Sequence, residues 1–238
     1  TDRSRGLGDV YKRQPLYLTG ETMGRLTETI LDAIYPPNLA CAICGSEAHT
    51  DSHELCAECA ALIQPAGIIG GSGFIDDIYC AVHYTEHIAA AVHNYKYNDA
   101  RYLCRFFASL IELPKDWQID AVLPMPLHPN KLKKRGYNQS ALIARELCKK
   151  YGLMLDESLA VRIKDTKSQR ELDRSQRAEN MKNAFSASGS VKNKRILIID
   201  DVFTTGATMN ECAKALKSKG AAHVYAASAC MAGGDSAQ

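Results

Sequence analysis

Two adjacent carboxylates, Asp200 and Asp201, stand between two segments that give them chemical significance. They follow the aliphatic run Ile196-Leu-Ile-Ile199 and precede the small, hydroxylated run Thr204-Thr-Gly-Ala-Thr208. An aliphatic run that ends in acids is typical of a buried parallel strand reaching a functional edge of its sheet. Small side chains after the strand let backbone N–H groups converge on an anion. The residues that can do so are Thr204, Thr205, Gly206, Ala207 and Thr208.

A helix is predicted directly after this segment, over about 209–219, with Thr208 as its cap and Gly220 at its end. The positive end of its dipole favours a phosphate at the same place. The two acids add hydrogen-bond acceptors for hydroxyls and can help to hold a divalent cation. A ligand that satisfies both halves is a ribose 5-phosphate. The alternative is an acid pair that only caps a turn, but the combination of strand, acids, small residues and helix favours a ligand site.

Four cysteines form two Cys-x-x-Cys pairs that are separated by 11 residues. Two thiolate pairs at this spacing can surround one tetrahedral ion, for which zinc is the natural occupant. Because four thiolates fill the coordination shell, we expect a structural role for the ion, and we leave His49 and His53 as surface residues. The alternative is four unrelated reduced cysteines. The predicted ligands are Cys41, Cys44, Cys56 and Cys59.

A second loop with charge of the opposite sign is expected after the short apolar run 120–124. Prolines break this run, and four cations follow in the five residues 131–135. Such a cluster at a strand end can neutralise a pyrophosphate, whereas a solvated approach to a helix is the simpler interpretation. The phosphate-type segment at 204–208 favours the first. The cations are Lys131, Lys133, Lys134 and Arg135.

The remaining pattern is that of an α/β protein. With 238 residues, of which 46% are hydrophobic and 24% charged, the chain can bury one α/β core and a small accessory module. A net charge of +2 does not by itself imply a nucleic-acid or membrane partner, and no run is long enough to span a membrane. We expect a soluble, cytoplasmic protein. The predicted helices are 21–35, 86–95, 102–112 and 139–151, and the further strands lie near 75–79, 159–163 and 223–230.

Three segments fall outside these elements. Residues 1–14 are polar and join no periodic pattern, so they are either foreign to the native protein or a mobile native tail. Residues 64–73 are rich in glycine and are interpreted as a linker. Residues 164–180 alternate cations with glutamines and acids, which is consistent with a lid that meets a ligand or with an ordinary charged helix and loop.

The run Ile198-Ile-Asp-Asp-Val-Phe-Thr-Thr-Gly-Ala-Thr208 resembles the phosphoribosyl pyrophosphate (PRPP) loop of the type I phosphoribosyltransferases. The resemblance implies that Asp200 and Asp201 contact the ribose hydroxyls. It also implies that the segment from Thr204 to Thr208 surrounds the 5-phosphate.

The order of motifs along the chain resembles the ComF family of competence proteins. The matching elements are the two cysteine pairs, Tyr95-Lys-Tyr97, Pro124-Met-Pro-Leu-His128, Arg135-Gly-Tyr-Asn-Gln139, residues 169–180 and the PRPP loop. This resemblance implies a parallel sheet flanked by helices, the type I phosphoribosyltransferase fold, at 65–238. An N-terminal helix and a four-cysteine zinc module precede it at 15–64.

What the family implies about activity is open between two functions. The first is transfer of a phosphoribosyl group from PRPP with Mg²⁺ to a nitrogenous acceptor, with Lys164, Arg170 and the acid pair as catalytic residues. The second is a non-catalytic adaptor in DNA uptake that binds PRPP or nucleotide and contacts partner proteins or single-stranded DNA. The expected pyrophosphate site comprises Met125, Pro126, Leu127, His128 and Arg135.

Overall fold

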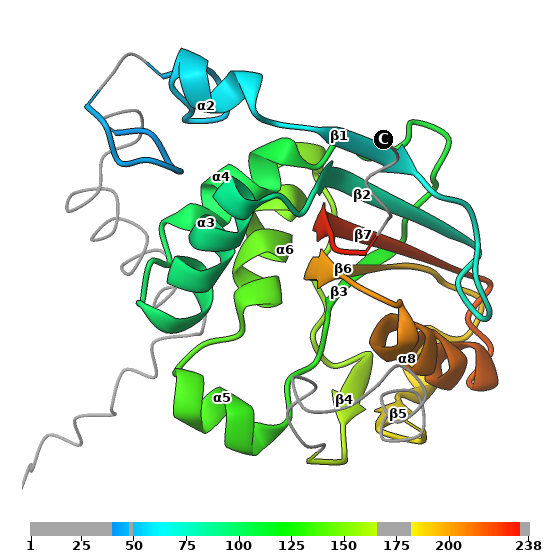
Figure 1. The fold of residues 1–238 in the computed structure, drawn as a ribbon. Helices are drawn as coiled ribbons and strands as arrows, with labels where there is room; N and C mark the ends of the chain where they lie inside the picture. Colours follow the sequence, from blue (N-terminus) through cyan, green and yellow to red (C-terminus); the bar gives the residue numbers. More distant parts are fainter. Residues whose placement is uncertain (1–39, 48–49, 166–181, 234–238) are drawn as a thin grey trace, which may run out of the picture. The chain divides into compact units, whose positions relative to one another are not determined.

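The computed structural model describes residues 40–47, 50–165 and 182–233, which fall within one compact unit, Asn38–Gln238. Its centre is a five-stranded sheet in the order β1-β2-β7-β6-β3 (Figure 1). The strands β2, β7, β6 and β3 run parallel, and β1 pairs antiparallel with β2 at one edge. The bounds are β1 Pro65–Ile68, β2 Asp77–His83, β3 Ala121–Pro124, β6 Arg195–Phe203 and β7 His223–Met231.

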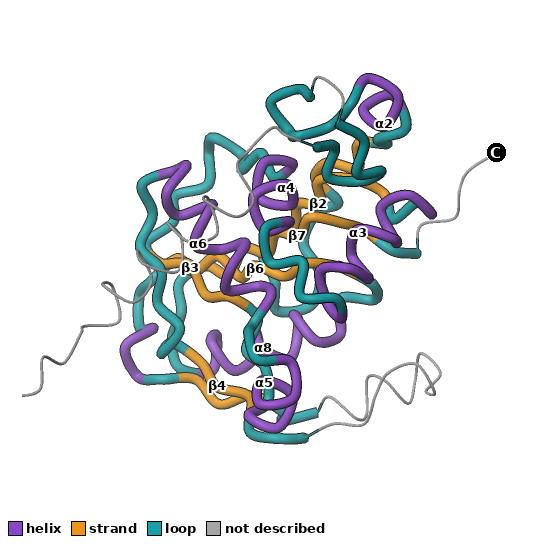
Figure 2. The backbone as a smooth tube through the Cα atoms, turned by 90° about the vertical axis from the view of Figure 1, so that its left-hand side faces the viewer, coloured by secondary structure: helices purple, strands orange, loops and turns teal. Residues whose placement is uncertain are grey.

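Helices cover both faces of this sheet. The helices α3, α4 and α6 lie in front of the strands in Figure 2, and α8 lies on the opposite side of the sheet in Figure 1. The small antiparallel pair β4 and β5 packs beside α8. The bounds are α3 Glu86–Tyr97, α4 Leu103–Leu110, α6 Gln139–Tyr151, α8 Ala207–Ser218, β4 Ala160–Arg162 and β5 Phe185–Ala187.

Strand β6 is buried on both faces, as the continuous aliphatic run predicts. Leu197 and Ile199 pack in the cluster under α3, α4 and α6, while Ile196 and Ile198 pack in the cluster under α8. Successive side chains of a strand point to opposite faces. The two acids that follow therefore have different neighbours: Asp201 pairs with Lys96 of α3, whereas Asp200 contacts Ser140 in the first turn of α6.

Helix α3 begins after Thr85 and buries one stripe, formed by Ile88, Ala91, Val92 and Tyr95. This is the spacing of one helical face, and it fixes the remaining residues of the last turn at the carboxyl edge of the sheet. Lys96 lies in that turn, where a cation is favoured by the partial negative charge of the helix end.

The mixed α/β fold with a mostly parallel sheet is confirmed, and two details of the sequence-based prediction are wrong. The helix after the acids begins at Ala207 with Gly206 at its N-cap, so Thr208 lies inside the first turn. The expected linker at 64–73 contains β1, because exposed glycines are compatible with a short edge strand. The cations at 131–135, expected to follow the proline-punctuated loop, lie on a helix, α5 Pro129–Arg135, which begins with proline and is followed by Gly136 at φ 84°.

The cysteine-containing segment packs against helices α3 and α4. Cys41, Leu55, Cys56 and Cys59 belong to the same buried cluster as residues of α3 and α4. The short helix α2 Ala57–Ala61 carries Cys59 on its buried side. The predicted helix at 21–35 and the tail at 1–14 lie outside the described residues.

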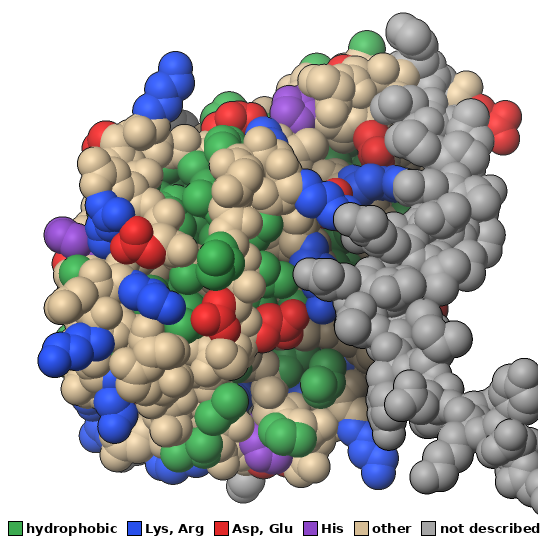
Figure 3. All heavy atoms as spheres, turned by 180° about the vertical axis from the view of Figure 1, so that it is seen from behind, with side chains coloured by type: hydrophobic (Ala, Val, Ile, Leu, Met, Phe, Trp, Pro, Cys, Tyr) green, Lys and Arg blue, Asp and Glu red, His purple; other side chains and the backbone are tan. Residues whose placement is uncertain are grey.

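Among the described residues, no helix combines the length and apolar character needed to cross a lipid bilayer. Figure 3 shows the face opposite to that of Figure 1, where hydrophobic side chains are interspersed with acidic and basic ones. Charged side chains of both signs thus lie on this face.

Candidate functional site: a cavity at the carboxyl ends of β3 and β6

A cavity of about 1080 Å³ opens at the carboxyl ends of the neighbouring parallel strands β3 and β6. Residues Met125, Pro126 and Leu127, which follow β3, form one side, and Thr204, Gly206 and Thr208, which follow β6, form the other. In open parallel sheets, ligands bind in this crevice beyond the carboxyl ends. The loops after β3 and β6, both predicted from the sequence to bind a ligand, therefore line the same cavity.

On the β6 side, Gly206 makes the turn into α8. It has φ of 71°, and a Cβ at this position would lie 2.7 Å from the ring of Phe203. Both the positive φ and the close ring require glycine. The result is a tight turn from which the first amides of α8 follow, and Asn210 N donates to Gly206 O at 2.8 Å as the helix starts.

Asp201 is held by a buried ion pair. Its Oδ2 lies 2.8 Å from the Nζ of Lys96, and its Oδ1 accepts a hydrogen bond from Val202 N at 2.9 Å. The carboxylate is only 4% exposed, whereas the lysine side chain is 21% exposed. Burial disfavours the charged ammonium, but the attraction of Asp201 outweighs it and raises the pKa of Lys96.

Asp200 has a different environment from its neighbour. Its Oδ1 accepts hydrogen bonds from Ser140 Oγ at 2.7 Å and from Asp201 N at 2.9 Å. Burial and the adjacent charge of Asp201 nevertheless raise the pKa of Asp200 to about 7. The acid pair thus consists of one carboxylate neutralised by lysine and one that can exchange a proton near neutral pH.

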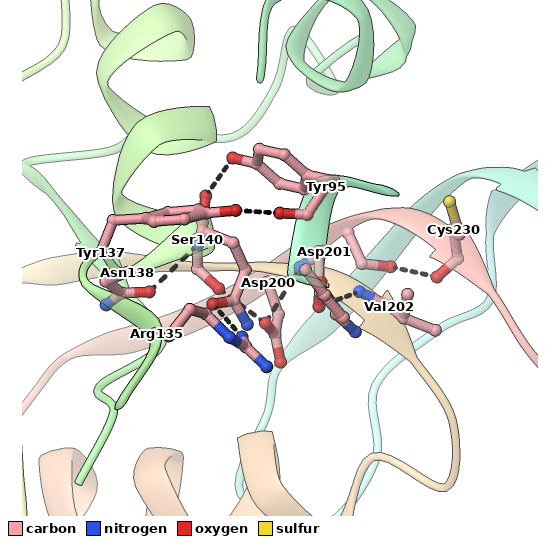
Figure 4. A network of polar contacts seen from close by, with 12 residues as sticks. Tyr95, Arg135, Tyr137, Asn138, Ser140, Asp200, Asp201, Val202 and Cys230 are labelled. Atoms are coloured by element: carbon pink, nitrogen blue, oxygen red, sulfur yellow. Dashed lines mark hydrogen bonds and ion pairs between the residues drawn. The ribbon is translucent and has the colours of Figure 1, made fainter. Parts of the chain in front are cut away.

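Two tyrosines lock α3 to the segment between α5 and α6 (Figure 4). Tyr95 OH donates to the carbonyl of Gln139 at 2.6 Å, and Tyr137 OH donates to the carbonyl of Tyr95. Their rings also contact each other, with centroids 6.3 Å apart. Tyr95-Lys-Tyr97 and the run at 135–139 are therefore one structural unit, although 38 residues or more separate them in sequence.

Cations converge on the β3 side of the cavity. Lys131, Lys134 and Arg135 of α5 line it, and Arg162 of β4 reaches it from the other side. The pKa of Lys131 is lowered by burial and by the nearby charge of Arg162, which indicates crowded positive charge. The guanidinium of Arg135 also lies 5.6 Å from the ring centre of Tyr97.

Not every residue expected at the site lines this cavity. His128 caps α5 by accepting from Asn130 N and lies 3.5 Å from Asp165. Lys133, Thr205 and Ala207 are not among the residues that line the cavity, and Ala207 N donates to Thr205 Oγ1 at 3.4 Å. Lys164 is exposed and donates to the carbonyl of Lys182 at 2.5 Å. The predicted Arg170 lies outside the described residues.

Two contributors were not assigned a role from sequence. Lys96 belongs to the Tyr95-Lys-Tyr97 run, which stood out by composition but gave no clue to its partner. Ser140 follows Asn138, whose side chain caps α6, and a serine in a first helical turn is usually read only as a capping residue. Neither residue is near the acids in sequence.

The four predicted metal ligands form a second cluster, far along the chain from the cavity residues. The Sγ atoms of Cys41, Cys44, Cys56 and Cys59 all lie within 4.8 Å of one another. The Sγ atoms of Cys44 and Cys56 are 3.8 Å apart. With Zn–S bonds of about 2.3 Å, a tetrahedron has S–S edges of about 3.8 Å, so the four residues fit a zinc ion. The hydroxyl of Ser46, 3.3 Å from Cys44 Sγ, helps to lower the pKa of this thiol to about 6.

Comparison with known protein families identifies the domain that contains the cavity. Residues 132–237 match a family described as a phosphoribosyl transferase domain. The chain therefore carries a phosphoribosyltransferase-type α/β domain, and the matched part contains the acid pair and the α5 cations Lys133, Lys134 and Arg135.

Three individual proteins are similar in sequence to this chain. Competence protein F of Haemophilus influenzae is 27% identical over 212 residues, which cover 77% of this chain and 93% of that protein. Competence protein ComFC of Streptococcus pneumoniae is 32% identical over 132 residues, covering 55% and 57%. DNA utilization protein YhgH of Salmonella typhi is 36% identical over 105 residues, covering 44% and 46%. These relatives and this domain together support a ComF-family protein that contains a phosphoribosyltransferase domain.

Among solved structures, a glutamine PRPP amidotransferase from B. subtilis aligns with a TM-score of 0.36 and 17% identity. The alignment covers 58% of this chain and 26% of that one.

Proposed function

We propose that the cavity binds PRPP. In this proposal the 5-phosphate meets the backbone N–H groups of residues 204–208 at the start of α8, and the ribose hydroxyls meet Asp200 and Asp201. The pyrophosphate lies between residues 125–127 and the three α5 cations that line the cavity, Lys131, Lys134 and Arg135. A carboxylate pair repels a bare phosphate, so a sugar diol between two anion-binding regions is the ligand that suits this order of charges.

One observation carries the proposal: the acid pair of β6 stands between a small-residue turn and a cationic helix within a single cavity. Six cationic and three acidic side chains line that cavity. An anion with several negative charges is favoured there, provided that its uncharged part faces the acids. The matching family model is that of a phosphoribosyl transferase domain, whereas the names of the relatives refer to competence and DNA utilization.

The reaction that follows is transfer of the phosphoribosyl group to a nitrogenous acceptor. The acceptor nitrogen bonds to C1 of the ribose, the bond from C1 to the pyrophosphate oxygen breaks, and pyrophosphate leaves with the electron pair. Mg²⁺ would supply charge neutralisation on the pyrophosphate, mostly through phosphate oxygens and water. Positive charge that develops on the sugar is stabilised by Asp200 and Asp201. Lys164 and Arg170 are proposed to stabilise the leaving group, together with Lys131, Lys134 and Arg135.

We further propose that the four cysteines hold a structural Zn²⁺ within an N-terminal module at 15–64, in front of the transferase domain at 65–238. None of the nine cysteines, all of which lie in the described residues, forms a disulfide, which suits a reducing cytoplasm. Because relatives are named for competence and DNA utilization, we propose a role in DNA uptake with DNA-uptake proteins or single-stranded DNA as partners.

The test is titration of the full chain with PRPP and Mg²⁺ by calorimetry, followed by a pyrophosphate-release assay over bases and amines. We expect saturable binding and acceptor-dependent release. Binding without release for any acceptor would support the adaptor function instead. If Asp200→Asn combined with Asp201→Asn left PRPP affinity unchanged, the assignment of the acids would be wrong.

A further inference from the structure

Lys96 is placed between Asp201 and the cavity. Its ammonium lies 2.8 Å from Asp201 Oδ2, and within the described parts of the chain this carboxylate is its one hydrogen-bonding or ion-pairing partner. An ammonium group carries three N–H donors. The side chain is 21% exposed and lines the cavity, so donors remain for a ligand.

The position of this ammonium is fixed before any ligand arrives. Tyr95, its neighbour in α3, is fully buried and donates to the Gln139 carbonyl, and Tyr137 donates back to the Tyr95 carbonyl. The last turn of α3 therefore cannot move independently of the segment that joins α5 to α6. A cation held in this way loses little conformational entropy when it binds an anion.

The surroundings show which end of a ligand the ammonium would meet. Lys96 and Arg135 both line this cavity, and the repulsion of Arg135 only partly opposes the rise in the pKa of Lys96 that Asp201 causes. The guanidinium of Arg135 lies over Tyr97, the residue that follows Lys96. Lys96 is thus part of the cationic side of the cavity, which α5 forms, and it comes from a different element.

We infer that Lys96 is an anion-binding residue of this cavity that keeps one N–H on Asp201 and donates another to the pyrophosphate group of the ligand. This inference rests on the proposed function and adds a binding residue from α3 to it. In this arrangement Asp201 orients the ammonium group of Lys96 and also remains ionised beside the sugar. The cation is shared between the protein carboxylate and the ligand, so it links the acid pair to the leaving group.

The test measures three ligands separately: PRPP, inorganic pyrophosphate and ribose 5-phosphate, each by calorimetry with the full chain. Lys96→Met is compared with wild type, with Lys96→Arg and with Lys133→Met, which removes an α5 cation that does not line the cavity. We expect Lys96→Met to lower the affinity for PRPP and for pyrophosphate by about 10- to 100-fold, which is the range for the loss of one hydrogen bond to a charged group. Ribose 5-phosphate should bind within about threefold of wild type.

Lys96→Arg should retain most of the affinity, and Lys133→Met should match wild type. Unchanged affinity for pyrophosphate in Lys96→Met would overturn the inference while leaving PRPP binding intact. Equal weakening of ribose 5-phosphate would also overturn it, since the lysine would then act only through Asp201 or the fold. If wild type bound none of the three ligands, the proposed function would fail as well. Lys96→Gln, which keeps a donor for Asp201, provides the same comparison if Lys96→Met does not fold.

Discussion

The hydroxyl of Ser140 donates a hydrogen bond to Asp200 Oδ1 at 2.7 Å and joins the first turn of α6 to the carboxyl end of β6. The preceding cap residue Asn138 donates through its side-chain amide to the carbonyl of Met125 at 3.1 Å. The start of α6 therefore contacts both the loop after β3 and the end of β6. These bonds hold the two sides of the cavity in register without a ligand.

Removing the serine hydroxyl should weaken ligand binding through Asp200. In Ser140→Ala the carboxylate loses a hydrogen bond that favours its ionised form. We expect PRPP affinity to fall by about 3- to 10-fold at pH 7, with a smaller loss at pH 8.5, where the carboxyl group is ionised in both proteins. Calorimetry at the two pH values measures this. Ser218→Ala, an exposed hydroxyl at the end of α8, is the control, and an equal loss at both pH values would contradict the explanation.

The raised pKa of Asp200 predicts a pH-dependent effect on stability. Its pKa is about 7 in the folded protein because burial and Asp201 disfavour the charge, against about 4 when unfolded. The neutral form is therefore favoured by folding, and this contribution is complete below pH 4 and lost as the pH rises through 7. Asp200→Asn should raise the unfolding midpoint relative to wild type at pH 8, and the difference should disappear near pH 4. Thermal unfolding at several pH values measures this, and a difference independent of pH would refute it.

The turn into α8 should tolerate no side chain larger than hydrogen. Gly206→Ala brings a Cβ within 2.7 Å of the Phe203 ring at a positive φ, so we expect a loss of about 1–3 kcal/mol in the free energy of unfolding. Affinity for ribose 5-phosphate should fall at the same time, because the amides at the start of α8 shift. Gly189→Ala, where the added Cβ contacts nothing within 4 Å and φ is not positive, is the matched control. Equal stability of the two variants in denaturant unfolding would contradict this account.

The cysteine cluster should contain about one zinc ion per chain. Cys41→Ser should lose the metal and lower the unfolding midpoint, because Cys41, Cys56 and Cys59 share a buried cluster with α3 and α4. Elemental analysis and thermal unfolding measure the two effects. Cys104 is half-buried and is not one of the four predicted zinc ligands, so the Cys104→Ser variant should keep the zinc ion. Iron with the visible absorbance of an iron–sulfur cluster would show that the ion is not zinc.

The parts of the site that are local in sequence could be predicted, and the parts that depend on long-range packing could not. Asp200, Asp201 and Gly206 lie in one strand-turn-helix unit, whose aliphatic run and small residues identify it without knowledge of the rest of the fold. Lys96 reaches Asp201 from a helix more than 100 residues earlier. Its run of aromatic and basic residues was visible, but only the parallel pairing of β6 with β7 and of β7 with β2 brings α3 beside β6.

The N-cap of α8 was predicted two residues too late for a different reason. Threonine is a favoured N-cap because its hydroxyl can accept a hydrogen bond from the first turn, so Thr208 was the natural choice. The ring of Phe203 packs over Gly206 and makes the chain turn two residues earlier. A side-chain contact across the turn thus decides the helix start, and helix boundaries respond to such contacts.

The central claim is that the turn after β6 and the helix after β3 hold opposite ends of one sugar phosphate. Crystals of the full chain soaked with PRPP and Mg²⁺ test this most directly. The account predicts the 5-phosphate on the amides of residues 204–208, the ribose hydroxyls at the acid pair and the pyrophosphate beside Arg135. PRPP bound with its diol away from Asp200, or a cavity that stays empty at saturating concentration, would contradict it.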